Sequence, residues 1–133
     1  MDRAFFKICN QGYIPTLAEL WRYTSYLDMR DLLYNAAEHF KRGQSFMERG
    51  ELDRAKTAYD KALKDLHAVR PQRMRDVLLA QVYLSRYQTN LNADTLGAEQ
   101  DLRIGYSYAK TTREPAIRSL AESLWATRQI AIK

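Results

Sequence analysis

The chain of 133 residues is poor in cysteine, proline and glycine, with one, three and five of them respectively. A single cysteine, Cys9, cannot form an internal disulfide, and it has no CxxC partner for a zinc or redox site. So few turn formers exclude an all-β fold, which needs a turn about every eight to twelve residues. We therefore predict a mostly helical protein in which Cys9 is a buried apolar side chain in a reducing compartment.

Long apolar runs are also absent. No segment approaches the roughly 18 apolar residues that a membrane-spanning helix requires. Only Ala4, Phe5 and Phe6 separate Arg3 from Lys7, which is too short for the apolar part of a secretory signal. With 46% hydrophobic and 28% charged residues, the chain has the composition of a globular domain and not of a disordered one. We expect a cytoplasmic protein without a membrane span.

Charge is unevenly distributed along the sequence. The formal net charge is +5, and residues 70–133 carry ten Lys and Arg against six Asp and Glu. The densest group is Arg70, Arg73 and Arg75, which we take as a candidate contact for phosphate, nucleic acid or an acidic partner. A solvated loop is the alternative explanation of this group. Because the total charge is modest, nucleic acid is the lesser of the candidate partners.

Apolar and small residues recur at spacings of three and four, which predicts helices joined by short turns. Thr16 and Glu19 form a capping box for one helix start, Gly50 suits a helix end, and Thr111 with Thr112 is expected to break a helix. Five or six helices fill the chain. They are expected from residue 16 onward and over about 28–48, 52–67, 74–90, 96–109 and 114–130, and a further short helix is expected near residues 5–12.

The stretch 36–66, AAEHFKRGQSFMERGELDRAKTAYDKALKDL, resembles a tetratricopeptide repeat, a helical hairpin of about 34 residues. Gly43 lies where that family packs a small residue between its two helices, and Phe46 where it places an aromatic one. Ala55, Tyr59 and Ala62 match the small, aromatic, small series of its second helix. The chain departs from the family at His39, where tryptophan is frequent.

The resemblance implies an all-α domain of antiparallel hairpins stacked as a short α-solenoid. We expect one domain over 1–133, with an N-terminal capping segment at 1–28 and the clear repeat at 29–69. A degenerate repeat follows at 70–111, and a C-terminal helix at 112–133 ends the stack.

In this family the first helix of each hairpin lines a concave face that holds a partner peptide or helix. The resemblance therefore implies a non-enzymatic protein-interaction scaffold. An alternative for any single residue of this face is simple packing against a neighbouring helix. The residues expected to face the partner are Phe40, Gln44, Met47, Met74, Val77, Gln81, Leu84, Arg118 and Glu122.

Motifs for catalysis are missing. His39 and His67 are too far apart in sequence to share a zinc site on one helix face, and no phosphate-binding or nucleophile motif occurs, so we expect no metal and no cofactor. Two alternatives to the scaffold remain open. Nucleic acid could bind Arg73, Arg75 and Arg86 with Tyr83 and Tyr87, and a homodimer could form through Trp125, Ile130 and Ile132 of the last helix.

Overall fold

The computed structural model describes residues 27–132, and the side chains of residues 29–128. This part of the chain is entirely helical and contains no strand, which confirms the all-α prediction. Cys9, most of the capping segment and the helices expected near residues 5–12 and from residue 16 lie outside the described residues. The helices are α3 (Leu27–Glu48), α4 (Leu52–His67), α5 (Arg73–Asn90), α6 (Thr95–Thr112) and α7 (Pro115–Ile132).

Local chemistry fixes where several helices begin and end. Gly50 follows α3 with a φ of 76°, the left-handed conformation that glycine adopts most easily, so the predicted stop is confirmed. The Glu51 N–H then bonds to the Phe46 carbonyl at 2.9 Å and closes the turn. The Asp94 carboxylate accepts a hydrogen bond from the Gly97 N–H at 2.9 Å and caps α6.

The helix break expected at Thr111 and Thr112 is wrong. Both residues belong to α6, and their hydroxyls donate to the carbonyls of Tyr108 and Ala109, one turn earlier, at 3.0 and 3.1 Å. Arg113 ends the helix instead, with a φ of 60° in the left-handed region. Pro115 then begins α7, at a position where its missing N–H costs no helical hydrogen bond.

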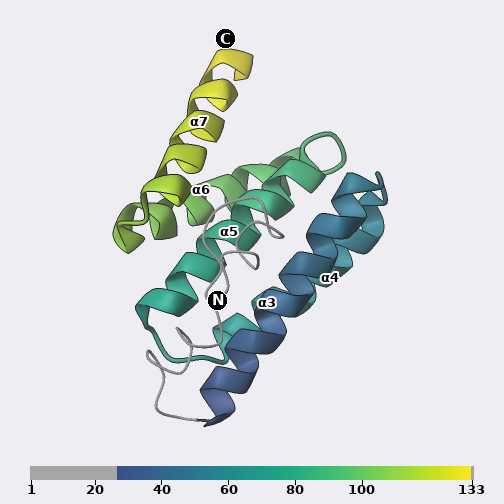
Figure 1. Cartoon of the computed structure of the whole chain (residues 1–133). Helices are drawn as coiled ribbons and strands as arrows, with labels where there is room; N and C mark the ends of the chain where they lie inside the picture. Colours follow the sequence, from purple (N-terminus) through teal and green to yellow (C-terminus); the bar gives the residue numbers. More distant parts are fainter. Residues whose placement is uncertain (1–26, 133) are drawn as a thin grey trace.

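The helices form two hairpins followed by a single helix. The most extensive contacts join α5 to α6 and α3 to α4. The second helix of each pair also packs on the helix that follows it, α4 on α5 and α6 on α7, while smaller contacts join α3 to α5 and α5 to α7. Figure 1 shows α7 extending past the other helices toward the C-terminus. Segments close in sequence are therefore neighbours in space throughout the described part.

In each hairpin a glycine of one helix faces a large side chain of the other. A Cβ at Gly43 in α3 would overlap Cε1 of Tyr59 in α4. A Cβ at Gly105 in α6 would lie 2.9 Å from Cδ2 of Leu84 in α5. Real Cβ atoms do not approach other atoms so closely, so only glycine lets a large side chain of the partner helix lie against the backbone. Tyr59 is completely buried there, and burial raises the pKa of its phenol.

The core consists of two clusters that meet on α5. Phe40 and Tyr59, with ring centroids 5.9 Å apart, belong to the first, together with Leu78 and Val82. The expected packing residues Gly43, Ala55, Tyr59 and Ala62 are all buried, and Phe46 is partly buried against this cluster. The second cluster is formed by α5, α6 and α7 and includes Val77, Leu84, Leu102 and Ile117. Because α5 contributes to both clusters, Arg73 and Gln88 are its only exposed residues.

A polar network joins α4, α5 and α6. Arg86 of α5 donates from Nε and Nη2 to both oxygens of Asp101 of α6 at 3.0 and 2.7 Å, and from Nη1 to Asp60 of α4 at 2.8 Å. Asn90 donates to Asp101 as well, at 3.1 Å. Asp101 is buried, and its hydrogen bonds to Arg86 raise the pKa of that guanidinium. The network therefore connects the first hairpin to the second.

The Gly43 contact predicts a large effect of a small substitution. Gly43→Leu should lower the free energy of unfolding by about 1–3 kcal/mol, because the new side chain overlaps the Tyr59 ring. Ser45→Leu, on the exposed face of the same helix, is the matched control. Urea denaturation measures both. An equal stability of Gly43→Leu and Ser45→Leu would contradict the close contact.

The Arg86 network predicts unequal roles for its two carboxylates. Asp101→Ala should destabilise the chain by about 2–4 kcal/mol, because it removes the buried partner and leaves Asn90 and part of Arg86 unsatisfied. Asp60→Ala should cost under about 1 kcal/mol, since the Asp60 side chain is 50% exposed. Thermal and urea unfolding of the two variants compare them. Similar losses in both would show that Asp101 is not the main anchor.

Candidate functional site

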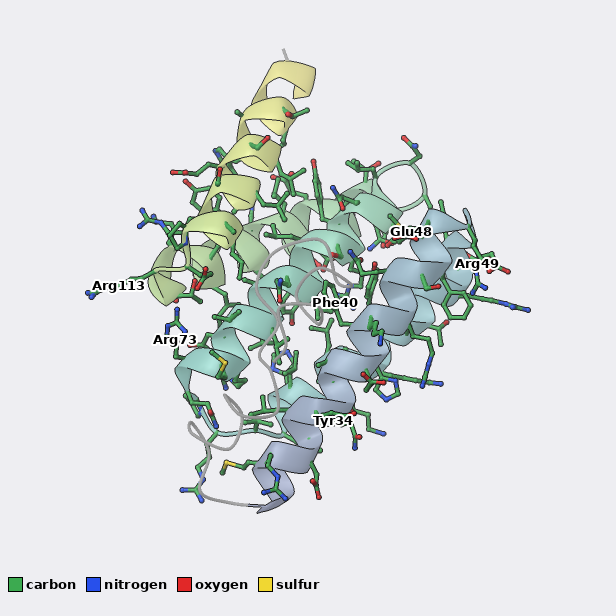
Figure 2. The ribbon with its side chains drawn as sticks, in the orientation of Figure 1. Tyr34, Phe40, Glu48, Arg49, Arg73 and Arg113 are labelled. Carbon is green, nitrogen blue, oxygen red and sulfur yellow. The ribbon has the colours of Figure 1, made fainter. Side chains whose placement is uncertain are left out.

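Most of the residues expected on the partner-binding face are inside the protein. Phe40, Met74, Val77 and Leu84 are 0% exposed, and Gln81 is 1% exposed. Figure 2 shows Phe40 on the inner side of α3, whereas Arg49 and Arg113 lie at opposite edges of the structure. Met47 is partly buried against the first core cluster, and Gln44 accepts a hydrogen bond from the Tyr59 hydroxyl. Arg118 and Glu122 of α7 are the fully exposed members of the set.

The apolar residues expected to bind a partner, such as Phe40, Met74 and Leu84, are therefore buried and inaccessible to it. The reason is the position of α5, which has α3, α4, α6 and α7 as neighbours. A periodic stripe of apolar residues predicts which side of a helix is buried, but α5 is buried on several sides at once. Packing against a neighbouring helix, the alternative explanation for each of these residues, accounts for Phe40, Val77 and Leu84.

The expected anion-binding arginines are engaged with the protein itself. Arg73 pairs with Glu114 at 3.1 Å, and Arg75 pairs with Asp76 at 2.8 Å while also donating to the Val69 carbonyl. Arg70 is exposed and has a partner of its own. Among the other candidate residues for nucleic acid, Arg86 is held by two carboxylates, and Tyr83 and Tyr87 are buried. These groups do not form a free basic and aromatic surface.

A cleft between α6 and α7 does combine exposed cations with aromatic rings. Its volume is about 430 Å³. Tyr106 of α6 and Trp125 of α7 form its aromatic wall, with ring centroids 5.1 Å apart and planes inclined by 48°. Both rings are partly exposed. The residues that line the cleft are Arg103, Tyr106, Ser107, Lys110, Thr111 and Trp125.

Cations flank this aromatic pair on both sides. The Lys110 amine lies 5.6 Å from the centroid of Tyr106, and the Arg128 guanidinium lies 4.9 Å from the centroid of the Trp125 ring. These cation–π contacts hold the two charged groups against the rings. Arg128 is also paired with Glu99, whereas Lys110 keeps its charge uncompensated among the described residues. None of the Asp and Glu side chains in the described part of the chain lines the cleft. The cleft therefore presents positive charge beside an apolar surface.

One carboxylate, Glu99, positions the cations at the end of the cleft. Arg128 of α7 donates to both oxygens of Glu99, and Arg103 lies 3.4 Å from it one turn along α6. The hydrogen bonds from Arg128 hold the pKa of Glu99 below its usual range. A fixed Arg128 in turn covers one side of Trp125. Glu99 thus joins α6 to α7 and orients the aromatic wall.

An amphipathic cleft with tryptophan and tyrosine beside cations resembles the centre of a protein interface, where Trp, Tyr and Arg are enriched. No group of three or more His, Cys, Asp or Glu side chains within residues 27–132 is placed to hold a metal ion. In the same part of the chain, no helix is long and apolar enough to cross a membrane.

Only part of the cleft can be predicted from the sequence. Arg103, Tyr106 and Lys110 follow one another at spacings of three and four, a basic and aromatic stripe that predicts one helix face. Trp125, by contrast, was expected in a self-association surface, and its place opposite Tyr106 depends on the packing of α7 on α6.

Comparisons of the chain with protein-family models, with curated proteins and with solved structures find no match. The resemblance to tetratricopeptide repeats therefore rests on the residues of the sequence. The function has to be inferred from the surfaces of this chain alone.

The Glu99 contact predicts a specific dependence of stability on pH. Because the pKa of Glu99 is lower in the folded chain than in the unfolded one, its stabilisation is present above the unfolded value and lost as pH falls. The loss should begin near the ordinary glutamate value of about 4.3. In Glu99→Gln this part of the pH dependence should vanish, whereas Glu122→Gln, exposed on α7, should keep it. Unfolding by urea between pH 7 and pH 3 measures it, and identical curves for Glu99→Gln and the wild type would contradict the assignment.

Proposed function

We propose that this chain is a non-enzymatic protein-interaction scaffold of tetratricopeptide-like hairpins that binds an acidic partner segment in the α6–α7 cleft. The single observation that carries the proposal is the exposed pair of Tyr106 and Trp125, flanked by Lys110 and Arg128. The partner segment would place an apolar or aromatic side chain against the two rings and its carboxylates against Lys110 and the exposed Arg103, because Arg128 is held by Glu99.

The order of helix contacts supports a stacked arrangement of hairpins. In a helical solenoid each hairpin touches only its neighbours, and the second helix of one pair meets the first helix of the next. The contacts of α4 with α5 and of α6 with α7 follow this order, as do the smaller contacts of α3 with α5 and of α5 with α7. In such a stack α7 would take the place of the first helix of a third hairpin.

The chemistry of the cleft supports a protein partner. Tyrosine and tryptophan offer a large, rigid contact area at little cost in conformational entropy, and such residues often dominate binding energies. The rings are already held by Arg128 and by each other, so they need little ordering when a partner binds. The exposed charges of Arg103 and Lys110 favour a segment that contains Asp or Glu.

Nucleic acid and self-association are the alternatives to this proposal. Bases could also stack on Tyr106 and Trp125, but the arginines expected to bind phosphate, Arg73 and Arg75, are paired with carboxylates. A homodimer through α7 would use Trp125 as well, so it would compete with the partner segment for the same ring. A protein partner of acidic character fits these contacts best.

The proposal is tested by selecting peptides from a random library displayed on phage with the full chain as bait. We expect selected peptides to carry Asp or Glu next to an aromatic or large aliphatic residue, and their binding to weaken with salt. Trp125→Ala should cost at least about 2 kcal/mol of binding free energy, as a central tryptophan does. Lys110→Glu, which changes an exposed residue, should weaken binding without altering the fold.

Arg118→Glu is the matched control, because Arg118 is exposed on α7 and does not line the cleft. It makes the same change of charge as Lys110→Glu. Equal effects of the two variants would contradict a specific cleft and point to general electrostatic attraction. Selection of no peptide, together with binding of single-stranded DNA that Trp125→Ala abolishes, would instead favour nucleic acid.

A further inference from the structure

A second cavity, of about 350 Å³, lies on the first hairpin between α3 and α4, on a surface that the proposed function does not use. His39, Arg42 and Phe46 of α3 share one helix face, at spacings of three and four, and meet Arg54, Ala58 and Lys61 of α4. This volume lies at the small end of the range for ligand pockets, about 300–1,000 Å³, so it suits a small ligand or a single side chain.

The charges around this cavity are unbalanced. Arg42 and Lys61 line it from different helices, and neither has an ion pair or hydrogen bond to any of residues 27–132. Arg54 is weakly held by Glu51 at 3.5 Å and remains 70% exposed. Among the described residues, Asp53 contributes the one carboxylate in the lining. Two uncompensated cations match the charge of a phosphate monoester, which is about −1.5 to −2 at pH 7.

The cavity also has an apolar and aromatic part. Ala58 is 5% exposed and lies in its lining, and the Phe46 ring is partly exposed there. The guanidinium groups of Arg49 and Arg54 lie 4.9 and 5.9 Å from the Phe46 ring centroid, which holds the ring in place. A ligand with a charged group alone would leave this apolar surface exposed to water.

We propose that the α3–α4 cavity binds an aromatic phosphate monoester, with the phosphate between Arg42 and Lys61 and the ring against Phe46 and Ala58. The same chemistry occurs in a phosphotyrosine side chain of a protein and in a free aryl phosphate. The site is independent of the α6–α7 cleft, because the two are lined by different helices. Failure of one proposal therefore leaves the other untouched.

Titration of the full chain with phenyl phosphate at pH 7.5, followed by calorimetry and by amide chemical shifts, tests the site. We expect phenyl phosphate to bind about tenfold more tightly than inorganic phosphate, because only phenyl phosphate buries a ring. Arg42→Gln and Lys61→Gln should each weaken binding by about tenfold, as the loss of a charged hydrogen bond does. Asp53→Asn should tighten binding by about two- to threefold, because it removes a like charge.

Lys64→Gln is the matched control, since Lys64 is exposed on α4 but does not line the cavity, and it should bind like the wild type. Absence of phenyl phosphate binding, or an equal loss in Lys61→Gln and Lys64→Gln, would overturn the proposal. Inorganic phosphate binding as tightly as phenyl phosphate would overturn the role of Phe46. A phosphotyrosine peptide that binds more tightly than phenyl phosphate would identify a protein as the source of the ligand, and the reverse order would identify a free aryl phosphate.

Discussion

The rest of this structure depends on one constraint, the distance to which the two helices of a hairpin can approach each other. In both hairpins a glycine allows the close approach. Gly43 makes room for the ring of Tyr59, and Gly105 makes room for Leu84. The glycine lies on the first helix of one hairpin, α3, and on the second helix of the other, α6. In each case a large side chain is buried against backbone, which stabilises the pair by contact over its whole surface.

The close packing of the helices affects which surfaces a partner can reach, because α5 is covered by its neighbours. Four helices contact α5, so the face on which a partner was expected is part of the core. The two surfaces proposed for binding lie elsewhere on the molecule. The cleft between α6 and α7 and the cavity between α3 and α4 both combine cations with an aromatic side chain. In both proposals an anionic partner is attracted by charge and held by apolar contact.

The sequence was a good guide to what depends on local spacing. Within the described residues it predicted the all-α fold and the helix positions to within a few residues, because apolar and small residues recur there at spacings of three and four. Gly43, Ala55 and Tyr59, expected at a helix contact, are buried. The sequence could not predict the number of neighbours of α5, the pairing of Arg86 with Asp101, or the meeting of Tyr106 with Trp125. Those depend on how helices far apart in sequence pack, and a periodic pattern describes only one helix at a time.

The most direct test of the hairpin packing is a nuclear Overhauser measurement on the isotope-labelled chain. The α-protons of Gly43 should show strong effects to the ring protons of Tyr59 and an upfield ring-current shift, since a Cβ at Gly43 would overlap that ring. The α-protons of Gly105 should show corresponding effects to the methyl groups of Leu84. Absence of both sets of contacts in a folded, helical sample would contradict the hairpin packing and, with it, the placement of both binding surfaces.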